Sequence, residues 1–370
     1  MESGKFYNWG DKMNIFVLIF VLLIYAGITF LIGWGLMKTL KAFGIWRWPF
    51  FYWSVFAFIA GSMFLSRIDG FVIFQIIGNY WMFFLEYGLI LTLLGILFYW
   101  ITPWKNIKII GGTGVAIILV LLVVGLYNAY IPTSREITLD IDKEADDLRV
   151  VVVSDFHLGV LSTKNHLERF VELSNEAKPD IVLLVGDIID DDPKWFIEQN
   201  MGETLAKLET TLGVYGVLGN HEYYGDQIDV FIEAIEEAGV TMLLDETLLI
   251  DDQYYLTGQE DMTNKQRLPL EELKPDDESK PWFIMNHTPL ELEIPTSLQA
   301  DFHVSGHTHK GQLWPNNFIT SRIFEVDYGH LKKENTHFLV SSGFGFWGPP
   351  MRIGSQAEIW VVDLNFNNEN

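Results

Sequence analysis

The sequence predicts an α/β protein in two parts, an N-terminal region of transmembrane helices and a C-terminal α/β domain. Long uncharged apolar stretches are confined to the first 130 residues. Those residues carry a formal net charge of +4, whereas the remaining 240 carry −27. From Glu136 onward, short β-branched runs alternate with charged segments of helical spacing, which is the pattern of an α/β fold. We therefore expect a membrane domain over residues 1–132 and a second domain over residues 133–370.

The composition excludes several classes of protein. Hydrophobic residues make up 49% of the 370 positions and aromatic residues 15%, which rules out a disordered or collagen-like chain. Cysteine is absent, so the chain has no disulfide, no thiolate nucleophile and no Cys-ligated metal. A nucleic-acid polymer is not an expected partner, because phosphate backbones are bound by clustered Lys and Arg rather than by carboxylates. No feature identifies a protein partner.

About four transmembrane spans are expected before residue 132. Met13 to Met37 is uncharged over 25 residues, and a helix of this length exceeds the roughly 30 Å hydrocarbon core of a bilayer. Trp48 to Ser66 is a shorter candidate. Gly70 to Trp104 is too long for one straight span and too short for two, so we expect a re-entrant or interfacial lead-in followed by a third helix. Ile109 to Tyr130 is the fourth, and Pro132 ends it.

The basic residues of the loops predict the orientation. Two loops expected on the same side of the bilayer carry most of them: Lys38, Lys41, Arg47, Lys105 and Lys108. The positive-inside rule places these loops in the cytoplasm and the acidic domain outside it. Glu86, the one charge within the third apolar stretch, has two readings. It is either a buried group facing a polar substrate or partner, or a residue near an interface.

The sequence of the second part predicts strands that are each followed by candidate metal-binding residues. Strands are expected at 148–154, 181–185, 214–218, 282–285 and 302–304, and helices at 163–177 and 192–210. Ligands of α/β folds collect at the carboxyl ends of strands. The loops after these five strands contain seven candidate ligands: Asp155, His157, Asp187, Asn220, His287, His307 and His309. Carboxylate oxygens and imidazole nitrogens in this number suffice for two divalent cations.

A pair of such cations is able to support the hydrolysis of a phosphate ester. Two cations about 4 Å apart can hold phosphoryl oxygens, neutralise their growing charge and lower the pKa of a bridging water, so that hydroxide attacks in line. An imidazole beside them can protonate the leaving oxygen near neutral pH. The remaining histidines are expected to be structural: His166, His303, His330 and His337.

The ordered motifs resemble one known family. They are D-x-H at Asp155 to His157, G-D-x-x-D at Gly186 to Asp190, G-N-H-E at Gly219 to Glu222, a single His287, and G-H-T-H at Gly306 to His309. In this order they resemble the calcineurin-like metallophosphoesterase family, over about Leu148 to Leu364. Each motif alone is weak, whereas the set is highly specific.

The resemblance implies an αββα sandwich with a binuclear site. Oxygen and nitrogen ligands of this kind accept manganese, iron or zinc. Carried over by position, one metal would be bound by Asp155, His157 and His309, and the other by Asn220, His287 and His307. Asp187 would bridge them. The resemblance also makes His221 the general acid or transition-state stabiliser, oriented by Asp190.

Further positions have two readings each. The stretch GFGFWGPP at 343–350, with Met351 and Arg352, resembles the C-terminal loop of the membrane-linked branch of the family. Lys310 stands where that branch has glycine, and it either touches a substrate phosphate or is solvated. Five aromatic residues either line an approach for a lipid chain or pack in the core: Tyr223, Tyr224, Phe344, Phe346 and Trp347. Three acidic residues either support the site or lie on the surface: Asp191, Asp192 and Glu222.

The sequence thus favours a membrane-bound, metal-dependent phosphoesterase acting on a phosphodiester, phosphomonoester or pyrophosphate bond. Attachment to the bilayer favours a lipid-linked or membrane-proximal substrate. One alternative is a phosphodiesterase for a soluble nucleotide, with the helices as an anchor only. Another is a membrane sensor or scaffold whose domain binds metal or ligand without turnover.

Overall fold

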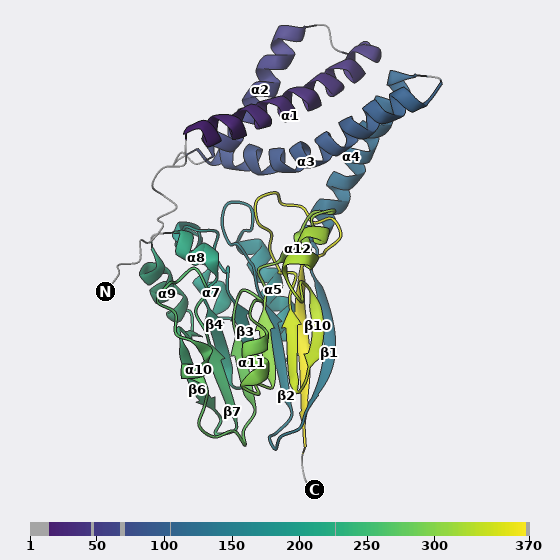
Figure 1. The fold of residues 1–370 in the computed structure, drawn as a ribbon. Helices are drawn as coiled ribbons and strands as arrows, with labels where there is room; N and C mark the ends of the chain where they lie inside the picture. The colour runs from purple at the N-terminus through teal and green to yellow at the C-terminus, as the bar shows by residue number, and fades with distance from the viewer. Residues whose placement is uncertain (1–14, 46–47, 67–70, 104, 226, 368–370) are drawn as a thin grey trace, which may run out of the picture. The chain divides into compact units, whose positions relative to one another are not determined.

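The computed structural model describes residues 15–45, 48–66, 71–103, 105–225 and 227–367 (Figure 1). It divides into two compact units, residues 1–121 and 122–370. The first unit is helical. The second contains all the described strands and begins within the last helix of the apolar region.

The apolar region forms four helices: α1 (Ile15–Ala42), α2 (Pro49–Leu65), α3 (Val72–Ile101) and α4 (Ile107–Tyr130). Among the described residues, α1, α3 and α4 are long and apolar enough to cross a membrane, whereas α2 has 17 residues. The prediction of a lead-in within Gly70–Trp104 is wrong for the described part. Val72–Ile101 is one continuous helix, because its glycines serve close packing rather than a break. A Cβ on Gly78 would lie 3.1 Å from the Cα of Met63 in α2.

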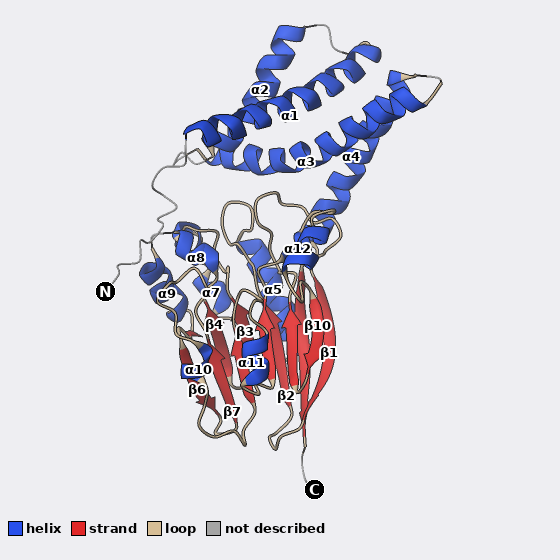
Figure 2. Ribbon diagram, in the orientation of Figure 1, coloured by secondary structure: helices blue, strands red, loops and turns tan. Residues whose placement is uncertain are grey.

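The second unit contains two six-stranded sheets (Figure 2). The first has the strand order β1-β12-β2-β3-β4-β5. Its strands are β1 (Thr133–Ile141), β12 (Glu358–Phe366), β2 (Leu148–Val153), β3 (Ile181–Val185), β4 (Gly213–Val217) and β5 (Val240–Met242). β2 to β5 pair in parallel, so their carboxyl ends lie at one edge. β12 is antiparallel to β2 and parallel to β1.

The second sheet has the order β10-β11-β9-β8-β7-β6. Its strands are β10 (Gly329–Lys333), β11 (Thr336–Val340), β9 (Phe302–Ser305), β8 (Trp282–Met285), β7 (Tyr254–Gly258) and β6 (Glu246–Ile250). The four middle strands are parallel, and the two edge strands are antiparallel to their neighbours.

Alternating side chains place the sheets face to face. On β2, Val150 and Val152 join a core with Phe283 of β8, whereas Val151 and Val153 point to the opposite face. Phe170 of α5 (Lys164–Ala177) covers that outer face. The outer face of the second sheet packs against α10 (Leu270–Leu273). Helix, sheet, sheet and helix thus form four layers, which confirms the expected α/β fold class.

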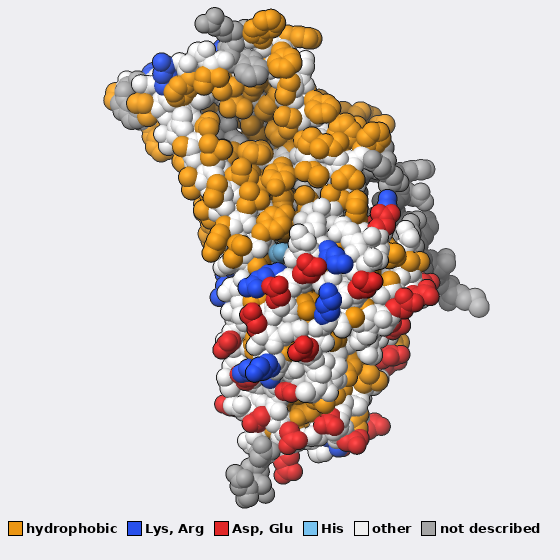
Figure 3. Space-filling view, turned by 180° about the vertical axis from the view of Figure 1, so that it is seen from behind, with side chains coloured by type: hydrophobic (Ala, Val, Ile, Leu, Met, Phe, Trp, Pro, Cys, Tyr) orange, Lys and Arg blue, Asp and Glu red, His pale blue; other side chains and the backbone are white. Residues whose placement is uncertain are grey.

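Short helices complete the domain: α6 (Lys194–Glu198), α7 (Gly202–Leu205), α8 (Asn220–Tyr224), α9 (Ile228–Glu236), α11 (Glu293–Ser297), the 3-10 helix η1 (His309–Gly311) and α12 (Asn317–Ile323). The helix expected over 192–210 is therefore two short helices. Asn200, between them, has a φ of 49°, which no α-helix accommodates. Figure 3 shows hydrophobic side chains over the apolar helices and charged ones over the domain.

Candidate metal centre

The seven candidate ligands all follow the carboxyl ends of strands. Asp155 and His157 come after β2, Asp187 after β3, and Asn220 opens α8 after β4. The three candidate histidines of the second sheet follow β8 and β9. Because the two sheets lie face to face, these loops meet at one end of the sandwich. Six of the seven side chains are buried, and His307 is half-buried.

One cluster joins Asp155, His157 and His309. The Nε2 atoms of His157 and His309 are 3.0 Å apart, and Asp155 Oδ1 lies 3.3 Å from His309 Nε2 and 3.9 Å from His157 Nε2. Two imidazole nitrogens and a carboxylate oxygen at such spacing fit the coordination of one divalent cation. These are the three residues that the family resemblance assigns to the first metal.

A second cluster joins Asp187, Asn220, His287 and His307. His307 Nδ1 is 2.8 Å from Asn220 Oδ1, and His287 Nε2 is 3.1 Å from Asp187 Oδ2. Nδ1 of His287 donates to the carbonyl of Val185 at 2.8 Å, so Nε2 is the ring nitrogen that faces Asp187 and would bind a cation. The donor set fits a second divalent ion.

Asp187 lies between the two clusters. Its Oδ2 atom is 3.1 Å from His287 Nε2 in one cluster and 3.7 Å from His157 Nε2 in the other. Its Oδ1 atom accepts a hydrogen bond from the backbone N–H of His221 at 2.9 Å, which fixes the carboxylate. This placement suits a bridging ligand.

The loops that carry the ligands are strained. Five of the seven have a positive φ: Asp155 (54°), His157 (45°), Asp187 (51°), His307 (68°) and His309 (48°). Non-glycine residues in this region cost roughly 1–2 kcal/mol each, and such residues concentrate at functional sites. Glycines provide the space. A Cβ on Gly219 would lie 2.2 Å from Asp187 Oδ1, and one on Gly306 would lie 2.3 Å from Asp155 Oδ2.

His221 lies beside both clusters and hydrogen-bonds to a carboxylate. Its Nδ1 atom is 2.6 Å from Asp191 Oδ1 and 3.5 Å from Asp190 Oδ1. The hydrogen-bonding partner in this structure is therefore Asp191, whereas Asp190, which was expected to orient the ring, lies at ion-pair distance from the same nitrogen. Burial alone would lower the pKa of His221, but the hydrogen bond to Asp191 and the charge of Asp187 outweigh it and raise the pKa to about 9.

The cation-free site has strongly shifted pKa values. Burial would raise the pKa of Asp187, but the neighbouring charge of His287 outweighs burial and lowers it. Conversely, burial would lower the pKa of His287, and the Asp187 carboxylate raises it well above the ordinary value. The pKa values of His157 and His309 fall well below 6.5, chiefly through burial. His157 and His309 are thus neutral, as ligands of a cation must be, whereas His287 would release its second proton when a cation binds.

Glu222 anchors two of the ligand loops. Its buried carboxylate accepts three backbone hydrogen bonds, from Gly219 at 2.7 Å, Ile189 at 3.0 Å and Asp187 at 3.1 Å. It therefore ties the loop after β3 to the loop after β4. From the sequence, Glu222 could either support the site or lie on the exposed surface. Its burial and its three hydrogen bonds favour the supporting role.

Arg352 is a further residue of the site that sequence reasoning noted only as part of a loop motif. It is fully buried, and Nη2 lies 3.3 Å from His309 Nδ1. The guanidinium also donates to the carbonyl of Gly345 at 2.9 Å from Nε and to that of Gly343 at 3.1 Å from Nη2. These bonds fix a positive charge behind a candidate ligand. The sequence pattern could not predict this contact, because Arg352 and His309 are 43 residues apart in the chain.

The remaining sequence candidates divide between core and surface. Phe344 and Phe346 are buried, whereas Tyr224 and Trp347 are 60% and 49% exposed. The four histidines expected to be structural all lie outside the candidate metal clusters of the described residues: His166, His303, His330 and His337. Of these, His330 is exposed and the others are buried. Asp192 caps its own loop by accepting from the backbone of Lys194.

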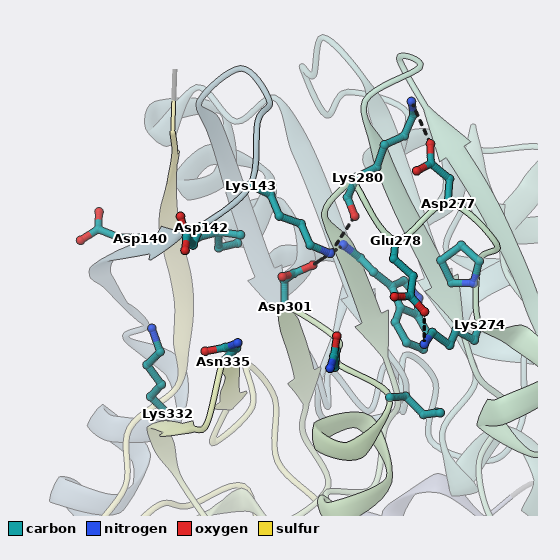
Figure 4. A pocket seen from close by; sticks show the side chains of 15 residues that line it. Asp140, Asp142, Lys143, Lys274, Asp277, Glu278, Lys280, Asp301, Lys332 and Asn335 are labelled. Atoms are coloured by element: carbon teal, nitrogen blue, oxygen red, sulfur yellow. Dashed lines mark hydrogen bonds and ion pairs between the residues drawn. The ribbon is translucent and has the colours of Figure 1, made fainter. Parts of the chain in front are cut away.

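A separate cavity of about 180 Å³ involves the ends of β1 and the loop before β8 (Figure 4). Its lysines are largely paired with carboxylates: Lys143 with Asp301, Lys274 with Glu278 and Lys280 with Asp277. Lys143 also donates to the carbonyl of Lys280 at 2.9 Å. These ion pairs neutralise most of the lysine charge inside the cavity. None of its lining residues belongs to the candidate metal clusters of the described chain.

Comparison with known proteins finds similarity over the second part of the chain. The family model of the calcineurin-like phosphoesterases matches residues 148–311. An uncharacterized metallophosphoesterase of Campylobacter jejuni is 29% identical over 63% of this chain and 63% of its own length. A transmembrane protein with metallophosphoesterase domain from Bos taurus is 30% identical over 66% of this chain and 60% of its own. Both alignments thus span less than two thirds of the relatives.

Solved structures are matched at lower similarity. TT1561 of Thermus thermophilus matches with a TM-score of 0.36 and 11% identity, over 53% of this chain and 91% of that one. A dimetal phosphatase from Danio rerio matches with a TM-score of 0.32 and 13% identity, over 52% of this chain and 86% of that one.

Proposed function

Because the chain carries a domain of the calcineurin-like metallophosphoesterase family, we propose that it is a membrane-bound hydrolase of phosphate ester bonds. The observation that carries the proposal is the position of Asp187, whose Oδ2 atom faces one imidazole of each ligand cluster. Two divalent ions bound there would supply Lewis acidity to the phosphoryl oxygens and lower the pKa of a bound water.

The chain's own residues supply the proton for the leaving group. Asp191 holds Nδ1 of His221, so the other ring nitrogen of His221 is the one free to act on a substrate. In the cation-free site the hydrogen bond to Asp191 and the charge of Asp187 outweigh burial and raise the pKa of this imidazole to about 9, and its protonated form can donate from that nitrogen. We assign His221 as general acid, Asp191 as the residue that positions it, and Asp190 as a second carboxylate near it.

A lipid-linked or membrane-proximal substrate is the finer part of the proposal. Two exposed aromatic rings flank His221, with ring centroids 5.3 Å away for Tyr224 and 6.4 Å away for Trp347. An apolar leaving group beside the general acid would cover both rings and remove them from water. The membrane helices would keep the site near such substrates.

The test is a panel of substrates given to the full-length chain purified in detergent. With manganese, the chain should hydrolyse a generic aryl phosphodiester, and a chelator should abolish this activity. It should then prefer an acylated phosphodiester in mixed micelles over a soluble nucleotide diester. Equal turnover of the two would favour the soluble-nucleotide enzyme. Manganese binding without any hydrolysis would favour the sensor or scaffold.

We also propose that residues 133–370 form the catalytic domain and face away from the cytoplasm. The support is the basic charge at the end of α1 and between α3 and α4, from Lys41 and Lys105 among others. The chain has no native cysteine, so a single exposed Asp276→Cys can report the side. A membrane-impermeant maleimide should label it in intact cells, and labelling only after lysis would reverse the orientation.

A further inference from the structure

A second cavity of the domain, of about 230 Å³, has a different character from the one in Figure 4. Its lining comes from four parts of the second unit: the end of α4, strand β1, the segment around η1 and β10, and the loop between β11 and β12. The lining residues are Asn128, Arg135, Lys310, Tyr328, Ser342, Gly354, Ser355 and Gln356. Two of these are cations and none is a carboxylate.

The charge of this cavity is only partly balanced. Arg135 donates from Nε to the buried Glu358, which also accepts from the hydroxyl of Tyr328 at 3.1 Å. Glu358 is thus neutralised by Arg135. Lys310 places its ammonium 4.1 Å from the ring centroid of Tyr328, and it forms no ion pair with any carboxylate in the described part of the chain. One positive charge is therefore left over in a domain that is otherwise strongly acidic.

The backbone holds Lys310 in a costly conformation. Its φ is 52°, in the left-handed region where glycine is the least strained residue. The hydroxyl of Thr308 accepts its N–H at 3.2 Å and helps to fix the turn. Non-glycine residues in strained conformations concentrate at functional sites, so this conformation supports a binding role for the ammonium of Lys310.

The cavity also has a hydroxyl able to donate. Ser355 Oγ accepts from Nη1 of the buried Arg352 at 3.2 Å, so its own proton is available to an acceptor in the cavity. An ammonium, a guanidinium and a hydroxyl together are donors suited to the oxygens of a phosphate group.

The cavity lies at the end of a candidate membrane span. Asn128 belongs to the last turn of α4, and its carbonyl accepts from Ala357 at 2.9 Å, directly after the lining residue Gln356. Its side chain donates to the carbonyl of Arg352 at 3.1 Å. The loop is thus fastened to the helix. Four apolar side chains of this end of α4 and the next residue are exposed: Val123, Val124, Tyr127 and Ile131.

An exposed aromatic residue also lies beside Gly354, one of the lining residues. A Cβ on Gly354 would lie 3.5 Å from Cβ of Trp314, which is 49% exposed, and the N–H of Trp314 donates to Ile353 at 2.7 Å. The ring centroid of Trp314 is 6.4 Å from that of Phe318 in α12, a helix without a buried residue. Tryptophan beside apolar side chains and a cation is the composition of a membrane interface.

We propose that this cavity binds the phosphate group of an anionic membrane phospholipid, with Lys310 and Arg135 as its cationic contacts. The recognised chemistry is a phosphodiester anion, and the source is the bilayer that α4 leaves at Tyr130. A net charge of −27 over the domain repels an anionic membrane as a whole, so a contact with lipid phosphates would depend on a local cationic site such as this one. The inference goes beyond the proposed hydrolysis and does not depend on it.

The test uses the full-length chain, treated with chelator so that the candidate metal centre does not bind phosphate. Native mass spectrometry from detergent would count bound phosphatidylglycerol against phosphatidylcholine. We expect phosphatidylglycerol to be preferred, and Lys310→Gln to weaken its binding about tenfold, since one charge-assisted hydrogen bond contributes roughly that ratio. The matched control is Lys332→Gln, a lysine of the other cavity, which should bind as the unchanged chain does.

A second variant distinguishes loss of the ammonium from disruption of the fold. Lys310→Gly suits the local backbone and should weaken phosphatidylglycerol binding by the same factor. Equal binding of both lipids, or unchanged binding by either Lys310 variant, would overturn the proposal. Displacement of phosphatidylglycerol by millimolar inorganic phosphate would overturn the lipid as the source and leave a site for the free anion. The readout involves no hydrolysis, so a failure here and a failure of the proposed enzyme are separate results.

Discussion

Replacing Glu222 by glutamine probes how the site is held together. The carboxylate accepts three backbone N–H groups, two at Oε2 and one at Oε1. A glutamine presents one oxygen and one NH₂ group, so at least one buried N–H loses its acceptor, which costs roughly 1–3 kcal/mol. The remaining bonds lose their charge assistance, whereas removing a buried charge near Asp187 offsets part of the loss. The expected destabilisation is about 2–4 kcal/mol.

For a domain of this size, that loss lowers the unfolding midpoint by about 5–15 °C. The assay is thermal unfolding of the full chain in detergent with chelator, and again with manganese. Manganese should rescue Glu222→Gln less than it stabilises the unchanged chain, because the loops of Asp187 and Asn220 lose their common anchor. Glu236→Gln, an exposed change on α9, is the control and should shift the midpoint by less than about 2 °C. If Glu222→Gln has the same unfolding midpoint as this control, Glu222 does not anchor the two loops.

Four further outcomes are expected. Asp187→Asn removes the bridging charge and should lower metal content and activity together, which elemental analysis beside a hydrolysis assay would separate from a purely catalytic defect. His221→Ala should keep its metal content and lose about a hundredfold in turnover, and an unchanged rate would exclude a general acid. Asp191→Asn should reduce turnover more than Asp190→Asn, because only Asp191 is at hydrogen-bonding distance from the ring; the reverse order would restore Asp190 as the orienting residue. Burial lowers the pKa of His303 to about 4, so its contribution is intact above pH 6.5 and stability falls as the pH drops toward 4, by up to about 1.4 kcal/mol per unit; His303→Phe should flatten that part of the curve of midpoint against pH.

The sequence predicted where the candidate ligands lie because their positions depend on a general rule of α/β folds. Strands 181–185 and 282–285 occur with the expected bounds as β3 and β8, and each ends at a candidate ligand loop. Buried β-branched runs and the residues that follow them are visible in a single sequence. The family resemblance is confirmed by the comparisons, and it extends over the same strands.

The contacts of individual side chains were beyond reach from the sequence. Asp190 and Asp191 are adjacent and chemically identical, and a backbone φ of 63° at Asp191 accompanies its contact with His221. Arg352 reaches His309 only because the loop before β12 folds back over the site. Lys310 could be read as solvated or as a phosphate contact, and only the structure places it over Tyr328.

The central claim is that distant loops hold two cations on either side of Asp187. Anomalous diffraction from crystals of the full chain loaded with manganese measures this directly. We expect two peaks roughly 4 Å apart, one beside His157 and His309 and one beside His287 and His307, with the Asp187 carboxylate between them. A crystal of active protein with no peak among these side chains would contradict it.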